Sequence, residues 1–287
     1  PYSTAELHEA YGAELVKKLT EKRIGAANYP LVRNFRGWAQ PDMTIEQCFT
    51  GDPYPIKGAW IQSTNILGGQ AADTQKHYEG LKRLEFIAVA DLFMNPTIQA
   101  LADIVLPVAT FAEKQSFRSW WAPLCAIVPA VKVDECRSDY EINVELANRF
   151  NANCKYKSVE ELINDRLKPS GYTYHELIER GGWEMPREGD SSRPYYRHEK
   201  GLLRQDGEPG FRTPSGKIEL YSSILEEWGY DPLVYYAEAS ESEVSTPDLF
   251  VKYPLVMATG RRSPVYFHAE HRMIPWLRQI DPYPIVE

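Results

Sequence analysis

Polar side chains follow three apolar stretches of this sequence, at the points where the stretches end. Ser63-Thr64-Asn65 follows the first, Asp91 and Asn95 follow the second, and Gly260-Arg261-Arg262 follows the third. A carboxylate can accept hydrogen bonds from both N1–H and the amino group of a guanine, and an amide can bind a ribose or phosphate oxygen. The planar arginine side chain suits phosphate oxygens. These residue types are compatible with a nucleotide ligand.

Each group also has a purely structural interpretation. Asp91 could cap the helix that follows it, Asn95 could close a turn with Pro96, and the arginine pair could be solvated. The Ser63–Asn65 turn could serve only the fold, although Gly68 and Gly69 would let the backbone approach a ligand.

Several kinds of chemistry are not indicated. His268 and His271 are three residues apart without an evident third ligand, so we expect no metal site. The sequence has no G-x-G-x-x-G, P-loop, G-x-S-x-G or H-E-x-x-H motif. A nicotinamide-dependent dehydrogenase is therefore disfavoured.

The polar groups need a scaffold, and the pattern around them predicts a parallel sheet. We predict strands at residues 57–63, 83–91 and 104–107, and helices at 71–83, between the last two strands, and at 139–150. Apolar strands joined through helices are typical of sheets covered on both faces, whose ligands lie beyond the carboxyl ends of the strands. Further strands are predicted at 126–133, 217–221 and 255–258, and helices at 4–20, 158–167 and 173–180, with a capping box at Ser158 and Glu161.

Composition narrows the partners. The chain has 287 residues, a net charge of −8, 43% hydrophobic and 25% charged residues, which is ordinary for a globular protein of one or two domains. The acidity argues against a nucleic-acid partner. No apolar run approaches the ~20 residues of a membrane span, so we expect no direct membrane insertion. Cys48, Cys125, Cys136 and Cys154 match no zinc or iron–sulfur spacing, and we expect free thiols.

Four segments, in order, resemble the molybdopterin oxidoreductases of the dimethyl sulfoxide reductase type, which include formate dehydrogenases, nitrate reductases and thiosulfate or polysulfide reductases. The segments are Ala59–Asn65 (AWIQSTN), Arg83–Gln115 with its ADIVLP core, Gly210–Ser222 (GFRTPSGKIELYS) and Tyr253–His268 (YPLVMATGRRSPVYFH). Glycine commonly follows the glutamate of the second segment in the family, whereas Gln115-Ser116 stands here.

The resemblance implies a cofactor and its contacts. Molybdenum or tungsten would be held by two molybdopterin guanine dinucleotides, with a 4Fe-4S cluster and the protein ligand to the metal supplied by regions that these segments do not include. The implied cofactor-binding residues are Ser63, Thr64, Asn65, Asp91, Asn95, Gly260, Arg261, Arg262, Tyr266 and His268. No catalytic residue or metal ligand is expected in this chain. The isolated chain is expected to hold no cofactor and to be inactive.

The same resemblance sets the expected organisation. We predict an α/β fold with a Rossmann-like parallel sheet, a helical and irregular segment, and the start of a C-terminal pterin-binding domain. The expected boundaries are 1–39 for an N-terminal helix and connection, 40–150 for the dinucleotide-binding domain, 151–235 for the helical segment, and 236–287 for a linker and the next domain. Because the sequence opens at Pro1 and closes where a strand begins, we expect an internal piece of a longer protein.

The partners implied are the remaining domains of the same polypeptide and an iron–sulfur electron-transfer subunit, with a sulfur oxyanion, formate or similar small molecule as substrate. A stand-alone Rossmann-like module that binds a nucleotide or a partner without catalysis is the alternative. The compartment stays open, cytoplasmic or exported. Glu113 either faces the cofactor or is a surface carboxylate, and Phe117, Trp120 and Trp121 belong either to the core or to an interdomain face.

Overall fold

The computed structural model describes residues 8–9, 11–35, 38–119, 124–150, 156–184, 195–257, 263–267, 271–283 and 285. The chain divides into two compact units, one of residues 40–195 and one of residues 1–39 together with 196–287. The domain boundaries expected from the sequence stay predictions.

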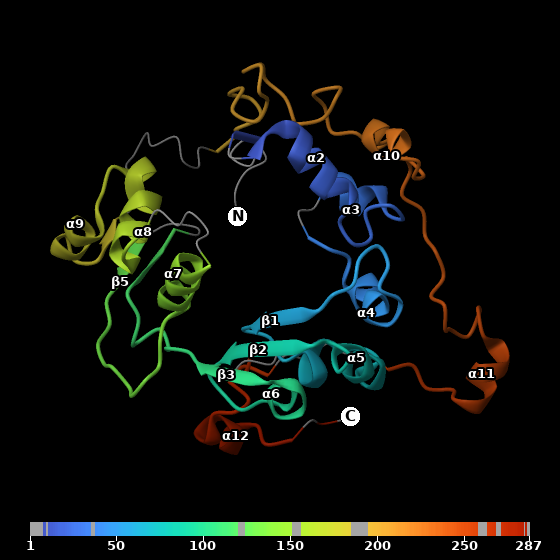
Figure 1. Cartoon of the computed structure of the whole chain (residues 1–287). Coiled ribbons are helices and arrows are strands. Elements are labelled where there is room, and N and C mark those ends of the chain that lie inside the picture. Colours follow the sequence, from blue (N-terminus) through green and yellow to red (C-terminus); the bar gives the residue numbers. More distant parts are fainter. Residues whose placement is uncertain are drawn as a thin grey trace. The chain divides into compact units, whose positions relative to one another are not determined.

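A three-stranded parallel sheet forms the centre of the unit of residues 40–195 (Figure 1). Its strands are β1 (Gly58–Gln62), β2 (Phe86–Asp91) and β3 (Ile104–Pro107), in the order β1-β2-β3. Val89 of the central strand pairs with Ile61 on one side and with Val105 on the other. The three strands predicted from the apolar runs are confirmed, and so is the α/β fold.

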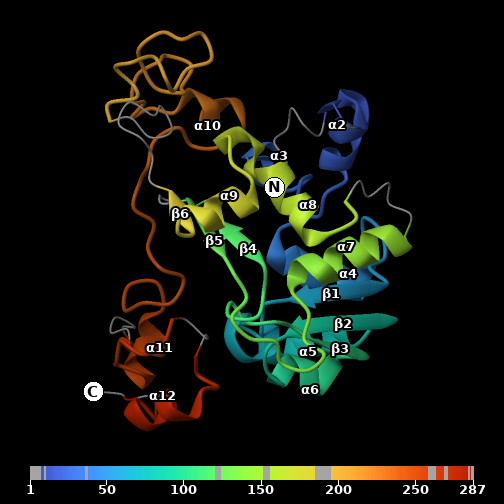
Figure 2. The ribbon, with the colours of Figure 1, turned by 90° about the vertical axis from the view of Figure 1, so that its left-hand side faces the viewer.

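Helices cover both faces of this sheet (Figure 2). Alternate side chains of β2 point to opposite faces. Ile87 and Val89 pack with residues of α4 (Pro41–Thr50), α5 (Thr74–Leu81) and α6 (Pro96–Leu101), while Ala90 packs with Ile142 of α7 (Asp139–Arg149) on the other face. Val89 has no exposed surface. Burial on two faces explains why β2 is an uninterrupted apolar run.

The connection from β1 to α5 differs from the prediction. Residues 66–70 form a short π-helical turn, η1 (Ile66–Gln70), and α5 begins at Thr74 rather than near residue 71. The Asp73 carboxylate caps α5 by accepting a hydrogen bond from the backbone N–H of Lys76 at 3.0 Å. A separate turn therefore lies between the first strand and its helix.

A small antiparallel sheet belongs to the same unit. It contains β4 (Ser116–Arg118), β5 (Leu124–Ile127) and β6 (Trp183–Glu184), with β5 in the middle. The predicted strand at 126–133 overlaps β5 only at its first two residues, because the pairing partners of β5 end there. Val128, Val131 and Val133 are exposed.

Three short helical elements pack beside this sheet: α8 (Val159–Leu167), η2 (Lys168–Ser170) and α9 (Tyr174–Glu179). Their shared core is Ile163, Leu167, Tyr174 and Leu177, and Phe117 packs against it. This contact favours the core interpretation of Phe117, while Trp120 and Trp121 lie outside the described residues.

The helix starts differ in how completely their capping boxes are formed. Ser158 accepts the backbone N–H of Glu161, but the Glu161 carboxylate accepts from Lys157 instead of returning to Ser158. The predicted capping box at α8 is therefore only half formed. Complete boxes occur at α7, with Ser138 and Glu141, and at α9, with Thr173 and Glu176.

The other unit contains α2 (Ala13–Glu21), α3 (Pro30–Phe35), α10 (Ser223–Glu227), α11 (Pro247–Lys252) and α12 (Pro275–Ile280). The helix predicted at 4–20 is found as α2 over its second half and as helical backbone at residues 8–9 and 11, with an interruption at Gly12, whose φ is 80°; residues 4–7 and 10 lie outside the described residues. None of the helices in the described part of the chain is both long and apolar enough to cross a bilayer.

Two strands predicted in this unit are not present. Residues 217–221 do not pair with another segment; the Glu219 carboxylate instead accepts hydrogen bonds from Ser215 and Ser223. Leu255, Val256 and Met257 are 90%, 81% and 85% exposed, without strand structure. A strand needs a neighbour to satisfy its backbone, and no described segment supplies one here.

Candidate functional site

The carboxyl edge of the parallel sheet gathers the first group of predicted site residues. Gln62 at the end of β1 is in register with Ala90, and the backbone N–H of Ser63 donates to the carbonyl of Ala90 at 3.3 Å. Asp91 is the last residue of β2. The prediction that Asp91 and Asn65 lie at the carboxyl edge of one parallel sheet is confirmed for the edge, and their facing the same crevice stays a prediction.

Asp91 is held by the loop that follows it. Its Oδ1 accepts the backbone N–H groups of Leu92 at 2.7 Å and Phe93 at 3.3 Å, and its Oδ2 accepts from the Asn95 amide at 3.0 Å. A carboxylate offers about four acceptor positions. One position therefore remains on Oδ2, and the long bond from Phe93 is the easiest to share.

Asn95 is an internal residue in this arrangement. It is 5% exposed, and its Oδ1 accepts the backbone N–H of Ile98 at 3.0 Å as the N-cap of α6. The amide nitrogen donates to Asp91. The geometry gives Asn95 the helix-start role that was the structural interpretation of the Asn-Pro pair, and binding to a ligand stays a prediction.

The Ser63–Asn65 turn presents three different polar groups. Ser63 is exposed and has a left-handed φ of 53°. The Thr64 hydroxyl oxygen is buried and has no hydrogen-bond partner. Buried polar atoms are nearly always paired, so this hydroxyl calls for a partner from outside the protein chain.

Asn65 is turned towards its own loop. Its Oδ1 accepts the backbone N–H of Gly68 at 3.1 Å and the hydroxyl of Thr97 at 2.9 Å. The Thr97 oxygen in turn accepts the backbone N–H of Leu67 at 3.0 Å. Two N–H groups at the start of the turn are thus satisfied internally and are not available to a phosphate.

Thr97 is a residue that the sequence reasoning missed. It is fully buried, although it lies at the start of α6 beside Pro96. No sequence signal marks it, because its partners Asn65 and Leu67 belong to the loop after β1 and spacing along the chain does not pair them with it.

A second polar group lies over the α7 face of the sheet. The Gln62 amide donates to Asp139 at 2.7 Å, and the Lys114 ammonium lies 3.4 Å from the other oxygen of the same carboxylate. Lys114 and Asp139 are each 27% exposed. This contact fixes the start of α7 to the end of β1, and the sequence reasoning did not select any of its members.

Glu113 has a structural role. Its carboxylate accepts from the backbone N–H and hydroxyl of Thr110 and from the backbone N–H of Val133. The hydrogen bonds from Thr110, followed by that from Val133, lower the pKa of Glu113 below its usual value. The carboxylate ties two loops together, as the simpler interpretation of this residue implied.

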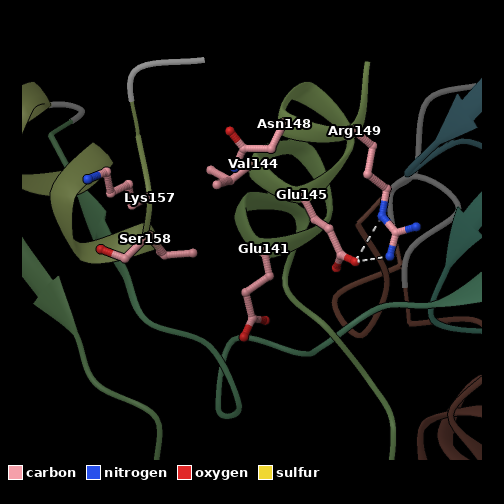
Figure 3. A pocket seen from close by; sticks show the side chains of 8 residues that line it. Glu141, Val144, Glu145, Asn148, Arg149, Lys157 and Ser158 are labelled. Carbon is pink, nitrogen blue, oxygen red and sulfur yellow. Dashed lines mark hydrogen bonds and ion pairs between the residues drawn. The ribbon is translucent and has the colours of Figure 1, made fainter. Parts of the chain in front are cut away.

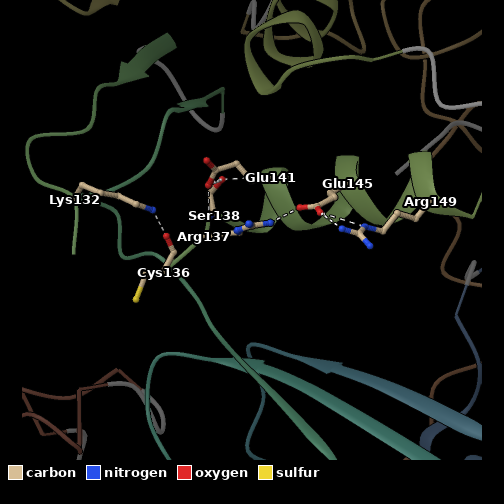
Figure 4. Close-up of polar contacts among 7 residues, drawn as sticks. All are labelled: Lys132, Cys136, Arg137, Ser138, Glu141, Glu145 and Arg149. Carbon is tan, nitrogen blue, oxygen red and sulfur yellow. Dashed lines mark hydrogen bonds and ion pairs between the residues drawn. The ribbon is translucent and has the colours of Figure 1, made fainter. Parts of the chain in front are cut away.

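Polar contacts along α7 form a separate network (Figure 4). Glu145 pairs with Arg149 at 2.7 Å and also with Arg137. The hydrogen bond from Arg149, assisted by the charge of Arg137, lowers the pKa of Glu145. Because Arg137 precedes the helix and pairs through its backbone with Val108, just beyond β3, this network links the entry of α7 to the carboxyl end of β3.

Two cavities lie elsewhere in the unit of residues 40–195. One of about 440 Å³ is lined by residues of α7 and of the start of α8 (Figure 3). The other, about 590 Å³, is lined by residues between Tyr156 and Thr173. Neither is lined by a predicted site residue. Residues 151–155, which connect α7 to α8, lie outside the described part, so no ligand is assigned to either cavity.

The remaining predicted site residues belong to the other unit. Gly260, Arg261, Arg262 and His268 lie outside the described residues. The Tyr266 hydroxyl donates to the Asp281 carbonyl at 2.7 Å, and the Arg272 guanidinium lies 4.7 Å from the centre of its ring.

The histidine, cysteine and carboxylate side chains of the described residues are dispersed. Among the described residues, no group of three or more His, Cys, Asp or Glu side chains could hold a metal ion. Cys48, Cys125 and Cys136 are not in disulfides, and Cys154 lies outside the described residues.

No protein-family model matches the chain, but individual proteins do. The chain is 31% identical to acetylene hydratase from Syntrophotalea acetylenica over 99% of this chain and 40% of that protein. It is 28% identical to the thiosulfate reductase molybdopterin-containing subunit of Salmonella typhimurium, over 64% of this chain and 26% of that protein. The structure matches acetylene hydratase from Pelobacter acetylenicus with a TM-score of 0.78 and 28% identity, over 95% of this chain and 39% of that chain.

The two acetylene hydratase matches extend over almost the whole chain, in sequence and in structure, although the chain spans only about two fifths of the length of those proteins. They agree with the order of family segments seen in the sequence. The chain belongs to the molybdopterin oxidoreductase family.

Proposed function

We propose that this chain supplies binding groups for molybdopterin guanine dinucleotide in a molybdenum- or tungsten-dependent oxidoreductase. When bound, the cofactor supplies the redox chemistry. The chain fixes its position and surroundings. The observation that carries the proposal is the carboxyl edge of the sheet, where the Asp91 carboxylate lies beside a turn that contains the unpaired, buried Thr64 hydroxyl.

The residues present fit the guanine end of such a cofactor. A guanine would receive one full hydrogen bond at the vacant position on Asp91 Oδ2 and a second on Oδ1, shared with the 3.3 Å bond from Phe93. The exposed Ser63 hydroxyl and the Thr64 hydroxyl could pair with ribose or phosphate oxygens. Gly260, Arg261, Arg262, Tyr266 and His268 are proposed as further cofactor-binding residues, as the family segment implies.

The rest of the enzyme is also part of the proposal. The protein ligand to the metal and a 4Fe-4S cluster would come from regions that the chain does not include, and the isolated chain would hold neither molybdenum nor iron and have no redox activity. The substrate class is a small molecule such as a sulfur oxyanion or formate. An iron–sulfur subunit would deliver or remove electrons. Elemental analysis of the purified chain checks this: stoichiometric iron or molybdenum would contradict it.

The test of the site compares two aspartates of the same βαβ unit. Asp91 lies at the carboxyl end of β2, whereas the Asp103 carboxylate accepts the backbone N–H of Ile87 at 2.7 Å, near the amino end of β2. Asp91→Asn keeps an oxygen for the loop but places an amide where the guanine needs an acceptor. Asp103→Asn makes the same chemical change at the opposite edge and serves as the matched control.

In the product of the complete gene, we expect Asp91→Asn to weaken cofactor retention by about tenfold or more, since a hydrogen bond to a charged group contributes about 1.5–3 kcal/mol. Asp103→Asn should retain the cofactor with at most a lowered melting temperature. Pterin content and melting temperature, measured on the same samples, separate the two. Full pterin content in Asp91→Asn would assign Asp91 to the loop alone, and a wild-type protein without pterin would overturn the proposed function.

A further inference from the structure

A single buried hydroxyl joins the two loops that form the carboxyl edge of the sheet. Thr97 is in α6, which follows the Asp91 loop, and it is fully buried. Its hydroxyl donates to Asn65 Oδ1 at 2.9 Å and accepts from the Leu67 backbone at 3.0 Å, both in the loop that follows β1. The two loops are 32 residues apart in sequence at the first of these contacts.

These contacts fix which way the Asn65 amide points. Oδ1 accepts from both Thr97 and the backbone N–H of Gly68, so its acceptor positions are filled. A flipped amide would place its NH₂ group against the N–H of Gly68, donor against donor. The oxygen is therefore committed to the protein, and the amide nitrogen is the group of Asn65 that is left for a ligand.

Gly68 supports the same arrangement from the other side. A Cβ atom built at residue 68 would lie 2.3 Å from Asn65 Nδ2, which is far inside van der Waals contact. An alanine at residue 68 would displace the Asn65 amide, so the glycine allows the amide to keep this position. The amide is held between the Thr97 hydroxyl and a position that has no side chain.

We infer that Thr97 is a positioning residue for the cofactor: its hydroxyl holds the Asn65 amide with the nitrogen available at the sheet edge and locks the loop after β1 to the loop that contains Asp91. This inference rests on the proposed function. Thr97 itself does not touch the ligand. It fixes the distance between the binding groups of the Asn65 loop and those of the Asp91 loop. The guanine and its attached sugar and phosphate would therefore contact binding groups in one fixed arrangement.

The experiment uses two substitutions in the product of the complete gene. Thr97→Val keeps the shape of the side chain and removes both hydrogen bonds, while Thr97→Ser keeps the hydroxyl. We measure the rate of release of pterin guanine dinucleotide, the melting temperature, and amide hydrogen exchange in the peptide that covers residues 65–70. With one net hydrogen bond in place, release from the wild type should be roughly three- to tenfold slower than from Thr97→Val.

Thr97→Ser should restore the rates of pterin release and of hydrogen exchange to within about twofold of the wild type. This difference is smaller than the change expected from the loss of one hydrogen bond. A lowered melting temperature in Thr97→Val, with release and exchange as in the wild type, would overturn the inference by leaving Thr97 a structural residue. If Thr97→Val does not fold, Gly68→Ala displaces the same amide from the other side, and unchanged release there would also overturn it. Absence of pterin from the wild-type protein would instead contradict the proposed function. In that case the hydrogen-exchange measurement would still test whether Thr97 orders residues 65–70.

Discussion

The two units of the chain differ in the contacts that stabilise each of them internally. In residues 40–195, three clusters of buried apolar side chains lie against the sheets and helices. In residues 196–257, large apolar side chains such as Leu220, Val234 and Leu255 are at least 86% exposed. The contacts there are local, such as the stacking of the His198 and Phe211 rings.

An apolar, β-branched run shows only that a segment is able to form a β-strand, and not that it does so. The run FIAVA in β2 and the run PLVM at residues 254–257 look alike in sequence. The first has a paired strand on each side and helices on both faces, whereas the second has neither among the described residues. The neighbours decide which run becomes a strand.

The largest expected effect comes from making the same change in both runs. Val89→Ala should lower the free energy of unfolding by about 2 kcal/mol, because the side chain is fully buried and a cavity would remain. Val256→Ala should change it by less than about 0.5 kcal/mol, since the side chain is 81% exposed. Denaturant unfolding of both variants checks this, and equal losses would show that residues 254–257 are packed in solution.

A smaller effect is expected for the hydroxyls that order the backbone. Ser138 is buried and completes a capping box with Glu141, so Ser138→Ala should cost about 1 kcal/mol. Ser242 accepts the backbone N–H groups of Val244 and Ser245 in a more open loop, and Ser242→Ala should cost about half as much, about 0.5 kcal/mol. Thermal melts of the two variants give the ratio, and a larger loss for Ser242→Ala would reverse the comparison.

The smallest effect is expected for a feature present in both units, a glutamate carboxylate that accepts several local hydrogen bonds. Glu113 and Glu219 are partly buried residues whose carboxylates each accept hydrogen bonds from neighbouring backbone and hydroxyl groups, and their pKa values are lowered mainly by Thr110 and Ser215, respectively. A lowered pKa stabilises the fold above the ordinary value near 4.5, and this contribution disappears as the pH falls through the lower, folded value.

We therefore expect Glu113→Gln and Glu219→Gln to melt slightly below the wild type at pH 7 and to converge with it as the pH falls below about 4. Because residues 215–223 carry little apolar burial, the Glu219 variant should also show faster local hydrogen exchange there. A difference that persists unchanged at pH 3 would mean that the lost contact does not depend on the charge.

The sequence was sufficient for the parallel sheet, its strand order along the chain and the residues at its carboxyl edge, because these follow from apolar periodicity and from the fixed direction of parallel strands. It was not sufficient for the contacts of those residues. Whether Asp91 faces a ligand or its own loop depends on where Leu92, Phe93 and Asn95 place their N–H groups, and no sequence pattern gives such positions. Thr97 was missed for the same reason, since its partners Asn65 and Leu67 belong to another loop.

Ser63 has an unfavourable backbone conformation at the carboxyl edge of the sheet, which lowers the stability of the fold. A serine with a φ of 53° is less stable by about 1 kcal/mol than it would be in an ordinary conformation, whereas glycine adopts this region freely. The simplest residue for the bend is therefore not the one present. Where a backbone tolerates an unfavourable angle while keeping a hydroxyl exposed, the shape of the turn and the chemistry of its side chain are separate requirements. Position 63 should accept few residues in any relative that uses the same bend.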